Sequence, residues 1–207
     1  MIDVRELVMI INVEQIEKKY KELIDMAKDM MKDCADVRHS MEHIEDVVIN
    51  TIEIIKRLPD NTNIDVDACI ISAYWHDVGR KIQSEEHGRI SADILKIELE
   101  KRKYDRAFIE TCYNAIAFHT MNINDVENDK IPETMEAKII KDADKIAFVG
   151  IGRWKHSINE NKRFKTITNS MFSVRNKILA LDVSKEIWDI RVLELIVFLH
   201  DEVFKNK

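Results

Sequence analysis

The spacing of hydrophobic residues predicts a chain made of α-helices. From residue 13 to about residue 34, apolar side chains recur every three or four positions, which places them on one face of a helix. The same spacing returns later, and we expect further helices at about residues 36–58, 66–77, 87–103, 105–120, from 133 onward and 183–203. Only two prolines and four glycines occur, so few residues are available for the turns of a sheet. The sequence therefore predicts an all-α fold with no significant sheet.

One predicted helix is apolar on nearly every side. Residues 68–75 (ACIISAYW) carry almost no polar group, and such a helix lies at the centre of a bundle. It ends in His76 and Asp77, followed by Gly79, which we expect to stop the helix in a left-handed conformation. An imidazole and a carboxylate at the end of a buried helix are costly to desolvate unless a partner compensates them. A divalent cation would be such a partner, although an aspartate cap beside a core histidine is the simpler alternative.

The charge and the cysteines argue against several classes of function. The formal net charge of −6 and the pI near 5.7 disfavour a nucleic-acid polymer or a membrane surface as partner. The three cysteines, at positions 34, 69 and 112, form no CxxC pair, which favours free thiols in a reducing compartment. No apolar run is long enough for a membrane span, and the first residues lack the basic region of a signal peptide. We therefore expect a cytoplasmic protein.

Histidines outside the central helix supply further residues of the metal-ligand type. His39 and His43 are four residues apart, so they share one face if this segment is helical. His87 begins one predicted helix, and His119 follows the apolar run AIAF. Each of them could instead be an ordinary surface or core histidine that needs only a hydrogen-bond partner.

Two carboxylates interrupt the apolar pattern of the segment KIIKDADKI. Asp142 and Asp144 lie in it, and the neighbouring Lys141 and Lys145 could balance their charge without a metal. Imidazoles and carboxylates from three separate helices could nevertheless form one centre. This mixture of ligands suits Mn, Fe, Ni, Co or Mg better than a structural zinc. The ligands that we expect are His43, His76, Asp77 and Asp144.

These residues lie in motifs that resemble those of a known family. The segments HSMEHIEDV, AYWHDVG, AIAFHT and PETMEAKIIKDADKI are similar to HDxxHxxRV, AALLHDIG, AIxxHS and TLEAKIVQDADRLD of small bacterial and archaeal HD hydrolases. The chain thus resembles the HD superfamily of metal-dependent phosphohydrolases over about residues 36–152. The resemblance implies an HD-domain helical bundle around a buried central helix, with the four metal ligands named above. It also implies that His39 is an accessory histidine before the first ligand.

The sequence departs from the family pattern at three places. Asp46 stands where an arginine is frequent, Ala147 replaces the second acid of DADRLD, and the segment GIGRW is shorter. None of these changes removes an expected ligand, but they leave the substrate open. We expect a single HD domain over residues 1–207, with the core motifs in 36–152 and carboxy-terminal helices at 166–205 that complete the bundle.

The resemblance implies a metal-dependent phosphohydrolase that acts on a small phosphorylated metabolite. We expect a nucleotide as substrate and a phosphomonoester or pyrophosphate bond as the bond cleaved. Asp77 would both bind the metal and act as partner of the attacking water, while Lys81, His87 and His119 would contact the phosphate. Lys81 and the adjacent Arg80 could equally be solvated loop charges. We expect one metal ion, although His87 and His119 would permit two.

Two other functions stay open at this level. A di-iron oxygenase of HD fold would use His87 and His119 as iron ligands. A degenerate HD module would only bind a nucleotide, and the intact set of histidines and aspartates argues against it. The sequence does not identify the general base, and a homodimer is neither required nor excluded.

Overall fold

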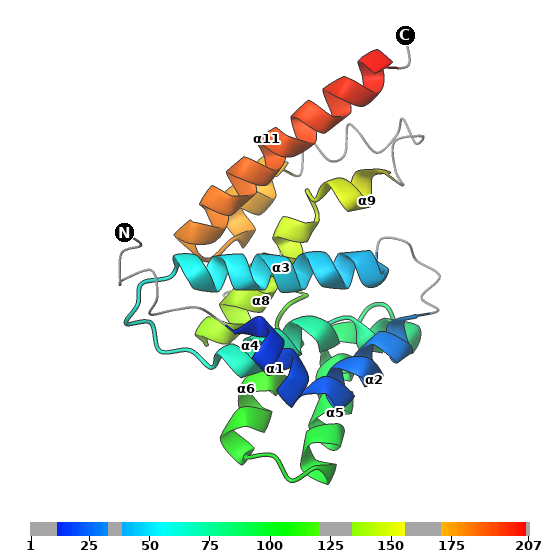
Figure 1. Ribbon diagram of the computed structural model, residues 1–207, viewed down its shortest axis with the longest axis vertical. Helices are drawn as coiled ribbons and strands as arrows, with labels where there is room; N and C mark the ends of the chain where they lie inside the picture. Colours follow the sequence, from blue (N-terminus) through cyan, green and yellow to red (C-terminus); the bar gives the residue numbers. More distant parts are fainter. Residues whose placement is uncertain (1–11, 33–38, 121–133, 156–170, 206–207) are drawn as a thin grey trace.

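The computed structural model describes residues 12–32, 39–120, 134–155 and 171–205, and it shows helices packed around one buried helix (Figure 1). No strand occurs among these residues, so the prediction of an all-α bundle is confirmed. The helices are α1 (Val13–Lys19), α2 (Lys21–Met31), α3 (Met41–Arg57), α4 (Val66–Trp75), α5 (His87–Lys101), α6 (Arg106–Ala117), α8 (Met135–Ala147), α9 (Ile151–Lys155) and α11 (Asp182–Lys205), with a 3₁₀ turn η3 (Val78–Lys81) and a π-helical turn η4 (Val174–Ile178).

Helix α4 is the central helix of the bundle. Every side chain from Ala68 to Trp75 is buried, as the apolar sequence predicted. Helices α2, α3, α6 and α8 pack around it. Asp65 caps its amino end, because the Ala68 amide donates a hydrogen bond of 2.9 Å to the Asp65 carboxylate. Since α4 is enclosed, the two residues at its carboxyl end, His76 and Asp77, are fully buried as well.

The chain leaves α4 through η3, where Gly79 allows a close approach to α5. A Cβ at this position would lie 2.4 Å from the carbonyl oxygen of His87 and 2.8 Å from the amide nitrogen of Ser91. The Gly79 amide donates a hydrogen bond of 2.7 Å to the Ser91 hydroxyl. The expected left-handed conformation is wrong, because no described glycine has a positive φ. Gly79 is therefore required for the space it leaves and not for its backbone angle.

The helix predicted from residue 13 is in fact two helices, α1 and α2, which meet at Tyr20. The backbone there has φ −110° and ψ 21°, outside the helical range. The Tyr20 ring stacks on Tyr104 and Phe108, and its hydroxyl donates a hydrogen bond of 2.9 Å to Asp67. These partners are distant in sequence, so the local spacing of apolar residues could not show the break.

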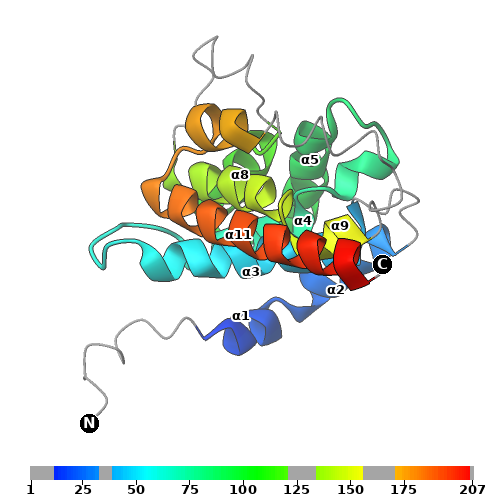
Figure 2. The ribbon, with the colours of Figure 1, turned by 90° about the horizontal axis from the view of Figure 1, so that it is seen from above.

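Helix α11 closes the bundle over α3 and α8, and its carboxy-terminal half projects beyond them (Figure 1 and Figure 2). Its position agrees with the helix predicted at 183–203, but its apolar residues do not form one stripe. Leu195 is completely buried, whereas Leu193 and Val197 are 64% and 62% exposed. The helix is therefore apolar on its solvent side as well as on its packed side.

Two charged residues of α8 hold the segment that leads into α11. The Asp142 carboxylate accepts hydrogen bonds of 3.0 Å and 2.9 Å from the amides of Ala180 and Leu181. Lys141 donates to the carbonyl oxygen of Ile178, and its Nζ is 3.3 Å from Asp142 Oδ1. Both side chains are buried, so this pair has a structural role.

The two described cysteines agree with the expectation of free thiols. Cys69 and Cys112 are both buried and unpaired, and burial raises the pKa of each thiol. Cys34 lies outside the described residues, as do residues 33–38 and 166–170 at the starts of two expected segments. Within the described ranges, no helix has the length and apolar character needed to cross a bilayer.

Candidate metal centre

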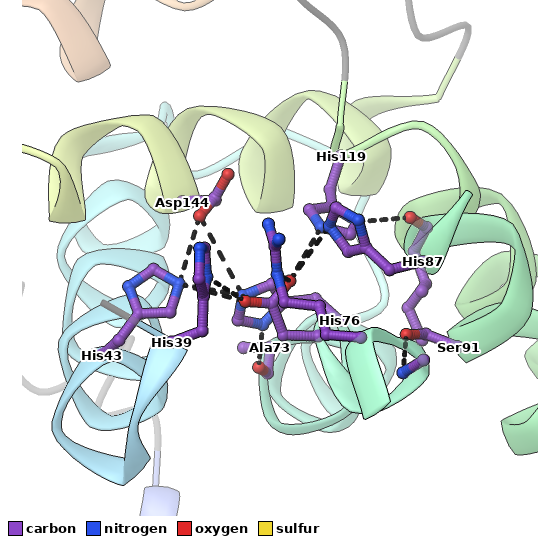
Figure 3. A network of polar contacts seen from close by, with 12 residues as sticks. His39, His43, Ala73, His76, His87, Ser91, His119 and Asp144 are labelled. Atoms are coloured by element: carbon purple, nitrogen blue, oxygen red, sulfur yellow. Dashed lines mark hydrogen bonds and ion pairs between the residues drawn. The ribbon is translucent and has the colours of Figure 1, made fainter. Parts of the chain in front are cut away.

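Five buried histidines gather with Asp77 and Asp144 at the carboxyl end of α4 (Figure 3). They come from the start of α3, the end of α4, the start of α5, the end of α6 and the middle of α8. Figure 3 shows His39 and His43 on one side of His76, His87 and His119 on the other, and Asp144 reaching in from α8. The described part of the chain thus brings together residues that are up to about a hundred positions apart.

The four ligands predicted from the sequence face one another. The Nε2 atoms of His43 and His76 are 3.2 Å apart. Asp144 Oδ1 is 3.3 Å from the first of these atoms and 4.0 Å from the second, and Asp77 Oδ2 is 3.6 Å from both. Ligand atoms around one ion at about 2.1 Å are separated by about 3 to 4 Å. Both imidazoles therefore face both carboxylates, as the ligands of one ion would.

Backbone carbonyls define the tautomers of three histidines, His76, His87 and His119. In each case Nδ1 lies within 2.6 to 2.8 Å of the carbonyl oxygen three residues earlier, at Ala73, Ser84 and Ile116. A carbonyl oxygen only accepts, so each Nδ1 carries the hydrogen. The Nε2 atom of each neutral ring is then an unprotonated donor for a metal, and the backbone fixes its direction.

Three buried atoms with unpaired lone pairs, from His87, His119 and Asp77, are arranged as they would be around a bound cation. Nε2 of His87 and Nε2 of His119 are 3.1 and 3.5 Å from Asp77 Oδ1. None of these three buried atoms has a properly oriented hydrogen-bond partner among the described residues. Burial lowers the pKa of His119 to about 4 and also lowers the pKa of His43. Near neutral pH, protonation of these two rings therefore does not provide a positive charge beside the carboxylates. The donor set therefore suits a divalent ion bound by imidazoles and carboxylates.

The two carboxylates are held in their ionised form. Burial alone would raise the pKa of Asp77, but the facing histidines, His76 foremost, hold it well below its usual range. Burial also opposes ionisation of Asp144, whereas the Lys145 ammonium, 2.8 Å from Asp144 Oδ2, holds its pKa well below the usual range. Lys145 was one of the partners that the sequence allowed. Anionic carboxylates beside neutral imidazoles are the protonation states that metal binding requires.

The other residues near the centre are placed partly as expected. His39 Nδ1 is 2.7 Å from Asp77 Oδ2, so His39 contacts a ligand of the centre, which agrees with an accessory position. Lys81 is exposed, and no hydrogen bond or ion pair in the described part of the chain joins it to the centre. Its neighbour Arg80 approaches instead, with Nε 2.7 Å from Asp77 Oδ1. Arg80 lies three residues after Asp77 in the sequence. Because η3 is a helical turn, this spacing brings the two side chains together.

Comparison with known proteins identifies the family of this chain. The family model of the HD domain matches residues 41–148, which include all four predicted ligands. A crystal structure of a predicted HD superfamily hydrolase from an uncultured Thermotogales bacterium is similar, with a TM-score of 0.66 and 18% identity over 95% of this chain and 100% of that chain. That likeness shows a common fold, and no curated protein matches the chain. Because the family model covers more than half of the 207 residues, this chain belongs to the HD domain family.

Proposed function

We propose that this protein is a metal-dependent phosphohydrolase that acts on a small phosphorylated metabolite, with a nucleotide as the substrate class. The observation that carries the proposal is the convergence of two imidazoles and two carboxylates on one point. The residues are His43, His76, Asp77 and Asp144. Membership of the HD domain family and the likeness to a predicted HD superfamily hydrolase support the same reading.

The four ligands would hold one divalent ion and leave positions for water and for a phosphoryl oxygen. Such an ion polarises the phosphoryl oxygen and lowers the pKa of water beside it. The protein itself orients the ligands, because the backbone carbonyl of Ala73 directs His76 and the His39 ring contacts Asp77 Oδ2. The ligand geometry is therefore set by the folded chain before any ion binds.

Asp77 and the histidines opposite it would orient the attacking water. Asp77 Oδ1 is anionic, and the Nε2 atoms of His87 and His119 lie 3.1 and 3.5 Å away. A water between them would donate a hydrogen bond to the carboxylate oxygen or to one of these imidazole nitrogens. This gives Asp77 its second role beside metal binding, and it gives His87 and His119 a role next to the phosphoryl group.

Cationic side chains at the partly exposed edge of the centre support an anionic substrate. Lys145 and Arg80 are each 21% exposed, and both contact carboxylates of the centre. Ammonium and guanidinium groups are the usual partners of phosphate oxygens. Lys145 and Arg80 are therefore better placed to contact a phosphate than Lys81, the residue that the sequence suggested.

A screen of phosphorylated compounds with Mn²⁺, Mg²⁺, Ni²⁺ and Co²⁺ tests the proposal. We expect release of phosphate or pyrophosphate from a nucleotide with at least one of these ions. His76→Ala should abolish metal binding and turnover together, because it removes a ligand from the middle of the centre. If His76→Ala keeps a full equivalent of metal after dialysis, the assignment of the centre is wrong.

A di-iron oxygenase is the second candidate, and one observation favours it. His87 and His119 both face Asp77 Oδ1, as ligands of a second iron would. Iron analysis combined with anaerobic spectroscopy distinguishes the two functions. A spectrum of a coupled iron pair that changes with oxygen would support the oxygenase, whereas metal-dependent phosphate release without oxygen supports the hydrolase.

A further inference from the structure

The histidine that α3 contributes to the centre is not oriented by a hydrogen bond of its own. Nδ1 of His76 lies 2.8 Å from the carbonyl oxygen of Ala73, so the backbone sets the direction of that ring. Nδ1 of His43, in contrast, is buried and has no hydrogen-bond partner among the described residues. A histidine that binds a metal usually donates its second ring hydrogen to a group that orients it. The position of His43 relative to the other ligands therefore depends on how α3 packs against its neighbours.

Asn50 joins α3 to the helix that carries Asp144. It follows His43 by seven residues, which is two helical turns, or about 10.5 Å, along the same face of α3. Its side chain is only 4% exposed, and its Nδ2 donates a hydrogen bond of 3.2 Å to the carbonyl oxygen of Ala143 in α8. Ala143 directly precedes Asp144, whose Oδ1 is 3.3 Å from His43 Nε2. Two neighbouring residues of α8 thus meet α3 at two points of the same face.

The carbonyl group that accepts this hydrogen bond does not need it for its own pairing. Within an α-helix, the carbonyl oxygen of residue 143 faces the amide of residue 147, and both residues belong to α8. The bond from Asn50 is therefore an additional one, and its loss would leave no buried carbonyl unpaired. An apolar side chain of similar size in place of Asn50 should cost little stability for this reason. What the bond adds is a fixed position of one helix against the other.

Two other contacts beside Asp144 join α8 to itself or to a different segment. Lys145 donates a hydrogen bond to Asp144 Oδ2, but it belongs to α8 and moves with it. The Asp142 carboxylate holds the backbone that leads into α11. The Asn50 amide, in contrast, links the two ligand-bearing helices directly. Because metal–ligand distances are held to within about 0.2 Å, even a small slide of α8 along α3 would weaken the site.

We propose that Asn50 is a positioning residue of the metal centre, which holds α8 in the register that brings Asp144 to His43. Asn50 touches neither the ion nor the substrate and acts through the peptide group of Ala143. This inference deepens the proposed function and rests on it, because it concerns the ion that these ligands would bind.

The affinity for Mn²⁺, measured by calorimetric titration of the metal-free protein, tests this role. Asn50→Leu keeps the approximate size of the side chain without the amide, and it should raise the Kd about tenfold. Thr51→Val is the matched control, because Thr51 is the next residue of α3, is fully buried, and has a hydroxyl without a partner in the described part of the chain. Its Kd should equal that of the wild type. The thermal midpoint of each metal-free variant should stay within about 4 °C of the wild type.

The visible absorption of the Co²⁺-loaded protein reports the geometry of the ligands, which a loss of stability alone would not change. The bands of Asn50→Leu should differ from those of the wild type, whereas Thr51→Val should keep the wild-type spectrum. Asn50→Gln keeps an amide donor and should recover part of the affinity that Asn50→Leu loses. Should Asn50→Leu not fold, Asn50→Ser replaces it with the same expected loss, because a serine side chain is too short to reach the Ala143 carbonyl.

The results that would overturn the inference differ from those that would overturn the proposed function. An unchanged Kd and spectrum in Asn50→Leu would make Asn50 an ordinary core residue and leave the proposed function standing. An equal loss of affinity in Thr51→Val would also overturn the inference, because any change inside α3 would then have the same effect. A wild type that binds neither Mn²⁺ nor Co²⁺ would refute the metal centre itself and this inference with it.

Discussion

The half-buried carboxyl group of Asp46 gives a stability prediction that does not depend on a metal. Asp46 lies on α3, one turn after Glu42, and a Cβ on Gly150 would be 3.1 Å from its Oδ2. Burial and the charge of Glu42 raise the pKa of Asp46 from 3.8 to about 6, although Arg191 acts in the opposite direction. The folded protein therefore binds a proton at Asp46 more tightly than the unfolded chain does.

The sign of the pH dependence follows from this difference. The contribution of Asp46 to the free energy of unfolding is fully present below about pH 4 and is lost as the pH rises through about 6. A pKa difference of about two corresponds to about 3 kcal/mol, and screening of this partly exposed group reduces it to about 1 kcal/mol. Asp46→Asn keeps the shape and removes the charge. The variant should therefore equal the wild type near pH 4 and exceed it by about 1 kcal/mol at pH 7.

Urea unfolding followed by circular dichroism, repeated between pH 4 and pH 7, measures this difference. Asp29→Asn is the matched control, because it makes the same substitution at an exposed carboxylate of α2. A constant difference for Asp46→Asn across the pH range would refute the reasoning. A wild type that is more stable than the variant at pH 7 would show that Arg191 stabilises the carboxylate more than burial opposes it.

Further substitutions test the parts of the fold that hold the centre. Gly79→Ala should lower the free energy of unfolding by about 3 kcal/mol, because its Cβ would meet the α5 backbone at 2.4 Å, and thermal unfolding measures the loss. Lys141→Met should also destabilise by about 3 kcal/mol, since it leaves the buried Asp142 without its ammonium partner; an unchanged midpoint would contradict a structural role of the pair. His87→Ala and His119→Ala should keep the first metal and a nearly unchanged thermal midpoint but lose about a hundredfold in turnover. Unchanged turnover with a lowered midpoint would instead make them ordinary core histidines.

Local sequence was sufficient to predict the central helix and much of the site. The continuous apolar run of residues 68–75 requires burial on all sides, so α4 could be identified before its neighbours were known. His76 and Asp77 follow this run directly, which placed them inside the bundle. His43 and Asp144 were predicted through their motifs, and the structure brings both next to His76, although their function as ligands stays a prediction.

Contacts between distant segments decided what the sequence could not show. The break at Tyr20 depends on the rings of Tyr104 and Phe108, which the spacing of apolar residues in one segment cannot reveal. Local charge also could not distinguish the two carboxylates of α8, because both are flanked by lysines, and only the family motif selected Asp144. The folded chain shows the role of the other carboxylate: Asp142 binds the backbone before α11, while Asp144 faces the histidines.

The clearest example is the choice between two adjacent cations after the central helix. In the sequence, Arg80 and Lys81 are equivalent loop charges, and Lys81 was expected at the phosphate. In the structure, the turn η3 directs Arg80 to Asp77 Oδ1 and leaves Lys81 exposed. Sequence patterns therefore determined which side chains must leave water, because burial follows local hydrophobicity. The tertiary structure alone decided which charge meets which, because that depends on the direction of each side chain across several helices.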